Sequence, residues 1–110
     1  MSKLHCITID CADPTTLSKF WAQALDGYAD DPSGLVVRSE SGPMMYFQKV
    51  PEGKPAKNRL HIDLGAPDVQ TEVDRLTALG ATAVREMSEG GMQWTIMADP
   101  EANEFCVCKT

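Results

Sequence analysis

Apolar and polar positions alternate near the beginning of the chain. In the segment 4–10, the apolar residues Ile7 and Ile9 fall on one face of an extended backbone. The opposite face then carries the alternate positions Cys6, Thr8 and Asp10. Because the side chains of a strand point to opposite faces in turn, this pattern predicts a strand with one buried face.

An apolar stripe with helical spacing follows this strand. Asp13 and Pro14 are favourable residues for the N-cap and the first turn of a helix. The apolar residues after them recur at intervals of three and four: Leu17, Phe20, Trp21, Ala24 and Leu25. The spacing places them on one face and predicts a helix over 14–25 that ends before Gly27.

The same order of signals returns 55 positions later, where Asp68 takes the place of Asp13. Alternation in the segment 59–64 predicts a second strand, with His61 and Asp63 on its polar face. A second apolar stripe predicts a helix over 69–79, followed by Gly80. Few residues are identical between the halves, but the repeated order of signals indicates an internal duplication.

Short strand segments separated by turn residues follow each helix. They cover 27–29, 35–39 and 44–50 in the first half, and 82–87, 92–98 and 104–109 in the second. A sheet this small cannot bury both of its faces alone, so the two halves are expected to pack together. The predicted fold class is α+β, with two βαβββ modules related by a pseudo-two-fold axis and forming a curved sheet around a cleft.

Composition and charge limit the function classes. The chain of 110 residues is 43% hydrophobic and 24% charged, which fits one globular domain: module one at about 3–50, a connector at 51–58 and module two at about 59–110. Ten Lys and Arg against sixteen Asp and Glu give a net charge of −6. This balance argues against nucleic acid and anionic membranes as partners, because both are bound by clustered cations.

Cysteine usage and the remaining patterns suggest a cytoplasmic protein. The four cysteines include no C-x-x-C pair and are too few for a secreted disulfide scaffold, so we expect reduced thiols. We see no signal-peptide pattern and no apolar run long enough to cross a bilayer. Nucleotide-binding glycine loops and the serine-hydrolase motif are also absent.

Three segments together resemble the vicinal oxygen chelate superfamily, and within it a glyoxalase-like branch of short bacterial proteins. They are IDCADPTTLSKFWAQAL near the beginning, KNRLHIDL in the middle and MADPEANEFCV at the end. The superfamily includes glyoxalase I, extradiol dioxygenases, fosfomycin-resistance enzymes and bleomycin-binding proteins. The resemblance covers essentially the whole chain, and it implies a ligand cleft between two βαβββ modules.

The resemblance also points to four positions that hold a metal ion in metal-dependent members, commonly as His or Gln, Glu, His and Glu. In this sequence those positions read Cys6, Gln48, His61 and Cys106. Both carboxylates are missing, and a hard divalent cation prefers oxygen ligands, so we expect no metal cofactor. The alternative is a divalent metal held by these four residues, or zinc held by the two thiolates and the imidazole of Cys6, Cys106 and His61.

Polar side chains on the strands are the remaining site candidates. Asp10, His61 and Asp63 are expected to lie near one another in the cleft, where they can bind a small organic molecule or transfer protons. Each also has a structural explanation, namely an internal hydrogen bond for the histidine and solvent exposure or helix capping for the carboxylates. The flanking strands add further candidates: Tyr46, Gln48, Glu104, Cys106 and Cys6.

The sequence therefore predicts a glyoxalase-like domain that binds a small molecule without the superfamily's metal set. Two alternatives remain open: a lyase or dioxygenase acting on a small oxygenated metabolite, and a protein that sequesters a bleomycin-type drug. A homodimer is expected, because two small half-sheets leave strand edges and apolar faces exposed.

Overall fold

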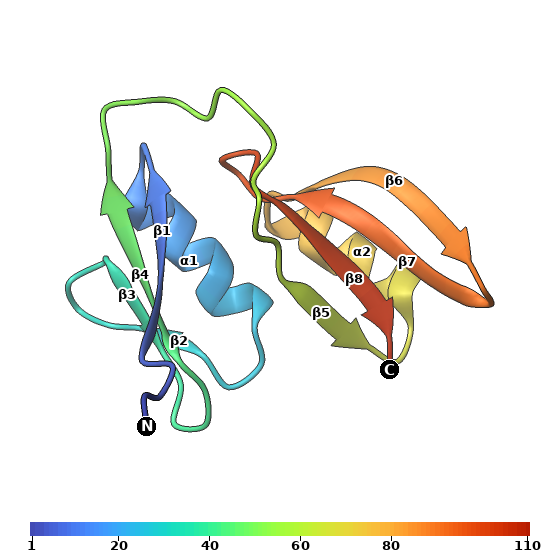
Figure 1. The fold of residues 1–110 in the computed structure, drawn as a ribbon, viewed down its shortest axis with the longest axis horizontal. Helices are drawn as coiled ribbons and strands as arrows, with labels where there is room; N and C mark the ends of the chain where they lie inside the picture. Colours follow the sequence, from blue (N-terminus) through green and yellow to red (C-terminus); the bar gives the residue numbers. More distant parts are fainter. The chain divides into compact units, whose positions relative to one another are not determined.

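The structure is a computed structural model that describes residues 1–110. The chain divides into two compact units, unit 1 with residues 1–53 and unit 2 with residues 54–110. In each unit one helix covers one face of a four-stranded sheet (Figure 1). Each helix has 11 residues, and neither has the length and apolar character needed to cross a membrane.

Unit 1 has the predicted βαβββ order. Its elements are β1 (Cys6–Cys11), α1 (Pro14–Ala24), β2 (Ala29–Asp30), β3 (Val36–Arg38) and β4 (Met44–Lys49). The strands lie in the order β1-β4-β3-β2, with β1 parallel to β4 and the other neighbours antiparallel.

Unit 2 repeats this topology. Its elements are β5 (Asp63–Ala66), α2 (Val69–Leu79), β6 (Thr82–Glu89), β7 (Met92–Ala98) and β8 (Glu104–Lys109). The order is β5-β8-β7-β6, and again only the first and last strands pair in parallel. The predicted fold class, α+β with two βαβββ modules, is confirmed.

Aspartate caps begin both helices, as the sequence predicts. The backbone N–H of Thr16 donates to Asp13 Oδ1 over 3.2 Å, and that of Thr71 donates to Asp68 Oδ1 over 3.1 Å. Helix α2 ends at Gly80, whose φ of +120° favours a residue without a Cβ atom. Helix α1 ends at Ala24, one residue before the predicted end.

The core of each unit lies between its helix and the inner face of its sheet. Unit 1 buries Leu17, Phe20 and Trp21 of α1 together with Val37, Met45 and Phe47 of the sheet. Unit 2 buries Val73 and Leu76 of α2 together with Met97, Phe105 and Val107. The alternate strand positions therefore point to the sheet face opposite the helix.

Three strands are displaced along the chain from their predicted positions, and three others, β3, β4 and β6, differ by one or two residues at their ends. The first strand covers 6–11 rather than 4–10, the strand expected at 27–29 is Ala29–Asp30, and the strand expected at 59–64 is Asp63–Ala66. His61 thus precedes β5. The reason is a side chain: Asn58 Oδ1 accepts from the backbone N–H of Glu104 over 3.0 Å, and Asn58 Nδ2 donates to the Glu104 carbonyl over 3.3 Å. These bonds occupy backbone groups that a longer β5 would pair with.

Candidate functional site

A groove of about 950 Å³ lies on the outer face of the unit 2 sheet. This volume is at the upper end of the range for small-molecule sites. All four strands of the unit and the residues just before β5 contribute to the lining. The side chains that matter below are His61, Asp63, Arg85, Met87, Trp94, Ile96, Glu104, Cys106 and Cys108.

Hydrogen bonds on both sides of His61 hold this residue beside β8, although it lies before the first residue of β5. On one side, the side-chain amide of Asn58 hydrogen-bonds both the N–H and the carbonyl of Glu104. On the other side, the carbonyl of Ile62 accepts from the N–H of Cys106 over 3.0 Å. Asn58 is therefore a positioning residue that the sequence analysis missed, because a lone asparagine in a polar connector gives no signal of a long-range contact.

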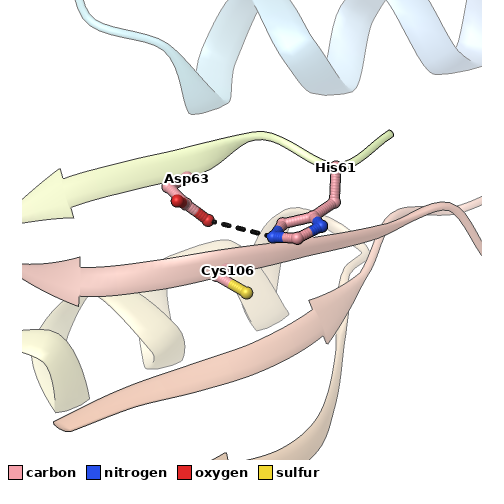
Figure 2. Close-up of side chains that lie close together, drawn as sticks. All are labelled: His61, Asp63 and Cys106. Carbon is pink, nitrogen blue, oxygen red and sulfur yellow. Dashed lines mark ion pairs between the residues drawn. The ribbon is translucent and has the colours of Figure 1, made fainter. Parts of the chain in front are cut away.

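Three side chains meet at the β5 edge of the groove: His61, Asp63 and Cys106 (Figure 2). One ligand atom from each lies within 4.8 Å of the other two. His61 Nε2 is 3.5 Å from Asp63 Oδ1, and these side chains are 52% and 62% exposed. An ion pair this exposed adds little to stability, so both groups remain available to a ligand.

Cys106 forms the buried side of this cluster, with 9% of its surface exposed. Burial, together with the neighbouring Asp63 carboxylate, raises the pKa of the Cys106 thiol to about 11. Burial likewise raises the pKa of Cys108, which lies two residues further along the same face. The floor of the groove at these positions is therefore uncharged near neutral pH.

The donors of this cluster differ from those of the metal site that the superfamily resemblance implies. His61 matches a histidine position, but Cys106 stands where the resemblance expects a carboxylate. A nitrogen, one carboxylate and a protonated thiol do not make the oxygen-rich shell that a hard divalent cation needs. The same donors suit zinc better, provided that the thiol loses its proton. The residues present therefore do not fit the superfamily's metal site.

The remaining sequence candidates lie in unit 1, on the outer faces of β1 and β4. The strand register places Asp10 beside Gln48 and Thr8 beside Tyr46. Cys6 is next to Met44, and its sulfur lies 3.8 Å from the Thr8 hydroxyl. Asp10 and Gln48 are exposed, whereas Cys6 and Tyr46 are half-buried. That these residues share a site with His61 and Asp63 stays a prediction.

The two strand registers show which residues of the two units correspond. Thr8 pairs with Tyr46, and its counterpart Asp63, 55 positions later, pairs with Cys106. Tyr46, not Gln48, is therefore the structural counterpart of Cys106. By the same registers, Met45 corresponds to Phe105 and Phe47 corresponds to Val107.

Arg85 is a second lining residue that the sequence analysis missed. It faces the groove because the register of β6 against β7 shifts between Ala83 and Arg85, leaving Val84 as an extra residue. Such a bulge changes which alternate positions face each side of a sheet. Alternation along β6 alone gives no sign of it.

Comparisons with known proteins agree with this architecture. The model of a family described as a glyoxalase-like domain matches residues 6–108. No curated protein matches the sequence. A glyoxalase/bleomycin resistance protein/dioxygenase family enzyme from Burkholderia phytofirmans is 17% identical, with a TM-score of 0.78 and 98% of both chains covered.

Two further solved structures are similar. A glyoxalase/bleomycin resistance protein/dioxygenase superfamily member from Sphaerobacter thermophilus is 18% identical, with a TM-score of 0.71 over 100% of this chain and 98% of that one. A lactoylglutathione lyase from Agrobacterium tumefaciens is 16% identical, with a TM-score of 0.65 over 99% and 94%. At these identities the likeness concerns the fold.

Proposed function

Because the chain belongs to the family of glyoxalase-like domains, whose model spans residues 6–108, we propose that it binds a small organic molecule in the groove of unit 2. The observation that carries the proposal is the groove itself. It joins an apolar floor to a small polar cluster, His61 and Asp63, at one edge. Ligand sites commonly combine apolar walls with a few convergent polar groups.

The polar cluster can orient a ligand. His61 offers nitrogens that donate or accept, and the Asp63 carboxylate accepts hydrogen bonds. Both side chains are more than half exposed, while the Cys106 thiol below them stays neutral. A hydroxyl or N–H group of a ligand can therefore donate a hydrogen bond to Asp63, and no thiolate lies beside this carboxylate near neutral pH.

We extend the proposal to the whole chain. The family match spans both units, so we propose that they act as one domain and that Asp10, Cys6, Tyr46 and Gln48 also take part in ligand binding. None of the four cysteines forms a disulfide, which is consistent with a reducing cytoplasm. Small-molecule binding is proposed without a metal, since the donor set does not fit the superfamily's site. Lyase, dioxygenase and drug-sequestration activities stay predictions.

A thermal-shift screen of small oxygenated metabolites and drug-like compounds tests the proposal. A ligand at a hundred times its dissociation constant adds about 2.7 kcal/mol to the free energy of unfolding, which shifts the melting temperature measurably. We expect His61→Ala and Asp63→Asn to abolish the shift while the protein stays folded.

His5→Ala is the matched control, because His5 is exposed and lies before β1. It should change neither the fold nor binding. If every ligand found in the screen binds equally well to wild type and to both site variants, this cluster does not form the binding site.

A further inference from the structure

The strand registers arrange the groove in rows that run across the sheet. One row contains Asp63 of β5, Cys106 of β8, Ile96 of β7 and Arg85 of β6. The next row contains Cys108, Trp94 and Met87. Adjacent strands are about 4.8 Å apart, so the backbones of Asp63 and Arg85 lie about 14 Å apart at opposite edges. The groove thus has a second charged end, far from the His61–Asp63 cluster.

Arg85 has no ion-pair partner at this end. It is exposed, and it forms none of the ion pairs of the structure, which join Arg38 to Asp31, His61 to Asp63 and Arg75 to Glu72. Its neighbours on the groove face, Ile96 and Met87, are apolar and half-buried. An unpaired guanidinium beside an apolar surface suits a carboxylate, which it can bind through two parallel hydrogen bonds.

The bulge in β6 places the positive charge of Arg85 in the groove. Ala83 pairs with Met97 on the helix side, so unbroken alternation would place Val84 opposite Ile96 and turn Glu86 toward the groove. The extra residue instead places Arg85 opposite Ile96 and Met87 opposite Trp94. Accordingly, Arg85 and Met87 line the groove, whereas Val84 and Glu86 do not.

The charge of the lining differs in sign from that of the chain. The groove is lined by three of the ten Lys and Arg residues, Lys57, Arg85 and Lys109, but by only two of the sixteen Asp and Glu residues, Asp63 and Glu104. A chain of net charge −6 therefore carries a groove with a small cationic excess. This local balance opposes a cationic ligand, which the net charge alone would favour.

We infer that the groove of unit 2 selects organic anions, with a ligand carboxylate bound by Arg85 and an apolar ligand body lying over Ile96 and Trp94. This inference rests on the proposed function and adds the chemical class of the ligand. It assigns the β6–β7 half of the groove to the acid and the apolar body, and leaves the His61–Asp63 edge to any further polar group of the ligand.

Three probes that differ in one group test the charge selectivity: 3-phenylpropanoate, its neutral amide and the cationic 3-phenylpropylamine. Binding is followed through the indole N–H signals of the 15N-labelled protein. Trp94 lines the groove, whereas Trp21 is 2% exposed in the core of unit 1 and serves as an internal control. The carboxylate should shift the Trp94 signal saturably and leave that of Trp21 in place. It should bind about tenfold or more tightly than the amide, and more tightly than the amine.

Two variants that each remove one positive charge separate the local effect from the net charge. Arg85→Gln should weaken carboxylate binding about tenfold or more and leave amide binding unchanged. Arg59→Gln removes an exposed arginine outside the groove and should change neither.

The inference is overturned if the amide or the amine binds as tightly as the carboxylate. It is also overturned if Arg85→Gln leaves carboxylate affinity unchanged, or if no probe shifts Trp94. The proposed function is judged separately, since it fails only if no screened compound depends on His61 and Asp63. Neutral or cationic ligands that depend on those residues would leave it standing without the anion selectivity.

Discussion

Cys106 lines the groove although the residue is only 9% exposed, and one carboxylate oxygen of Asp63 lies near its sulfur. Removing the thiol proton would place a second negative charge at the buried edge of this cluster. Desolvation and the neighbouring carboxylate therefore hold the pKa of Cys106 at about 11, above the ordinary value of 9.0. A thiol in this state is a weak nucleophile, so a covalent role for Cys106 near neutral pH is disfavoured.

This raised pKa predicts a loss of stability at alkaline pH. The unfolded chain releases the thiol proton near pH 9, whereas the folded chain keeps it until about pH 11, so the contribution is fully present below pH 9 and disappears toward pH 11. Urea unfolding of wild type and Cys106→Ala between pH 8 and pH 11 measures it. The stability advantage of wild type should shrink across this window, whereas parallel curves would contradict the prediction.

The same cluster supports a prediction about metal content. Purified protein should carry less than stoichiometric zinc, nickel or manganese, because the carboxylates of the superfamily's ligand set are missing and the Cys106 thiol is protonated. Elemental analysis measures this directly. One equivalent of metal that disappears in His61→Ala would instead show that His61, Asp63 and Cys106 form a zinc site.

At the scale of elements, both helices depend on a local signal at their first turn. The side chain of Asp68 accepts from the Thr71 N–H and satisfies one of the helix donors that have no backbone partner. Asp13 does the same for Thr16 and also accepts from its hydroxyl over 2.7 Å. These hydrogen bonds to Thr16 lower the pKa of Asp13, because they favour its ionised form.

Replacing the second cap tests its contribution. Asp68→Ala should lower the free energy of unfolding by about 1 kcal/mol, because the Thr71 N–H loses its acceptor. Asp68→Asn keeps an oxygen at this position and should stay close to wild type. Urea unfolding compares the three proteins. An equal loss in both variants would indicate that the charge of Asp68, rather than its capping hydrogen bond, stabilises α2.

At the scale of the whole molecule, the sheets leave strand edges open to other chains. Strand β6 is the eight-residue edge strand of unit 2, and all its residues except Met87 are exposed. Val84, the extra residue of the bulge, is 49% exposed, and Met92 at the beginning of β7 is 67% exposed. Open edges and exposed apolar side chains favour pairing between copies of a chain.

We therefore predict a homodimer in solution. Light scattering on the purified protein at micromolar concentration should give twice the chain mass of 12.0 kDa. Val84→Lys, which adds a charge to the exposed edge, should lower the mass if β6 lies in the interface. A wild-type mass of one chain would contradict the prediction.

Local sequence signals determined much of the fold. The Asp-Pro and Pro-Asp starts, the apolar stripes and the alternation in the strands predicted both helices within one residue and the βαβββ order of each unit. These signals predict the elements because helix capping, and the choice of which face of a helix or strand is buried, depend on residues only a few positions apart. Alternation also predicted that Asp63 lies on the polar face of its strand, while the family resemblance placed Cys106 in the cleft with Glu104 on the same face. These three residues line the groove.

Only the tertiary structure decided which strand residues meet. The side chain of Asn58 forms hydrogen bonds with the backbone of Glu104, 46 residues further along the chain. These bonds end the pairing of β5 and leave His61 before the strand. The register made Tyr46, rather than Gln48, the counterpart of Cys106, and the bulge at Val84 placed Arg85 in the groove. A shift of one residue exchanges the two faces of a strand without changing its composition. Long-range backbone hydrogen bonds therefore decide register, and local sequence patterns do not.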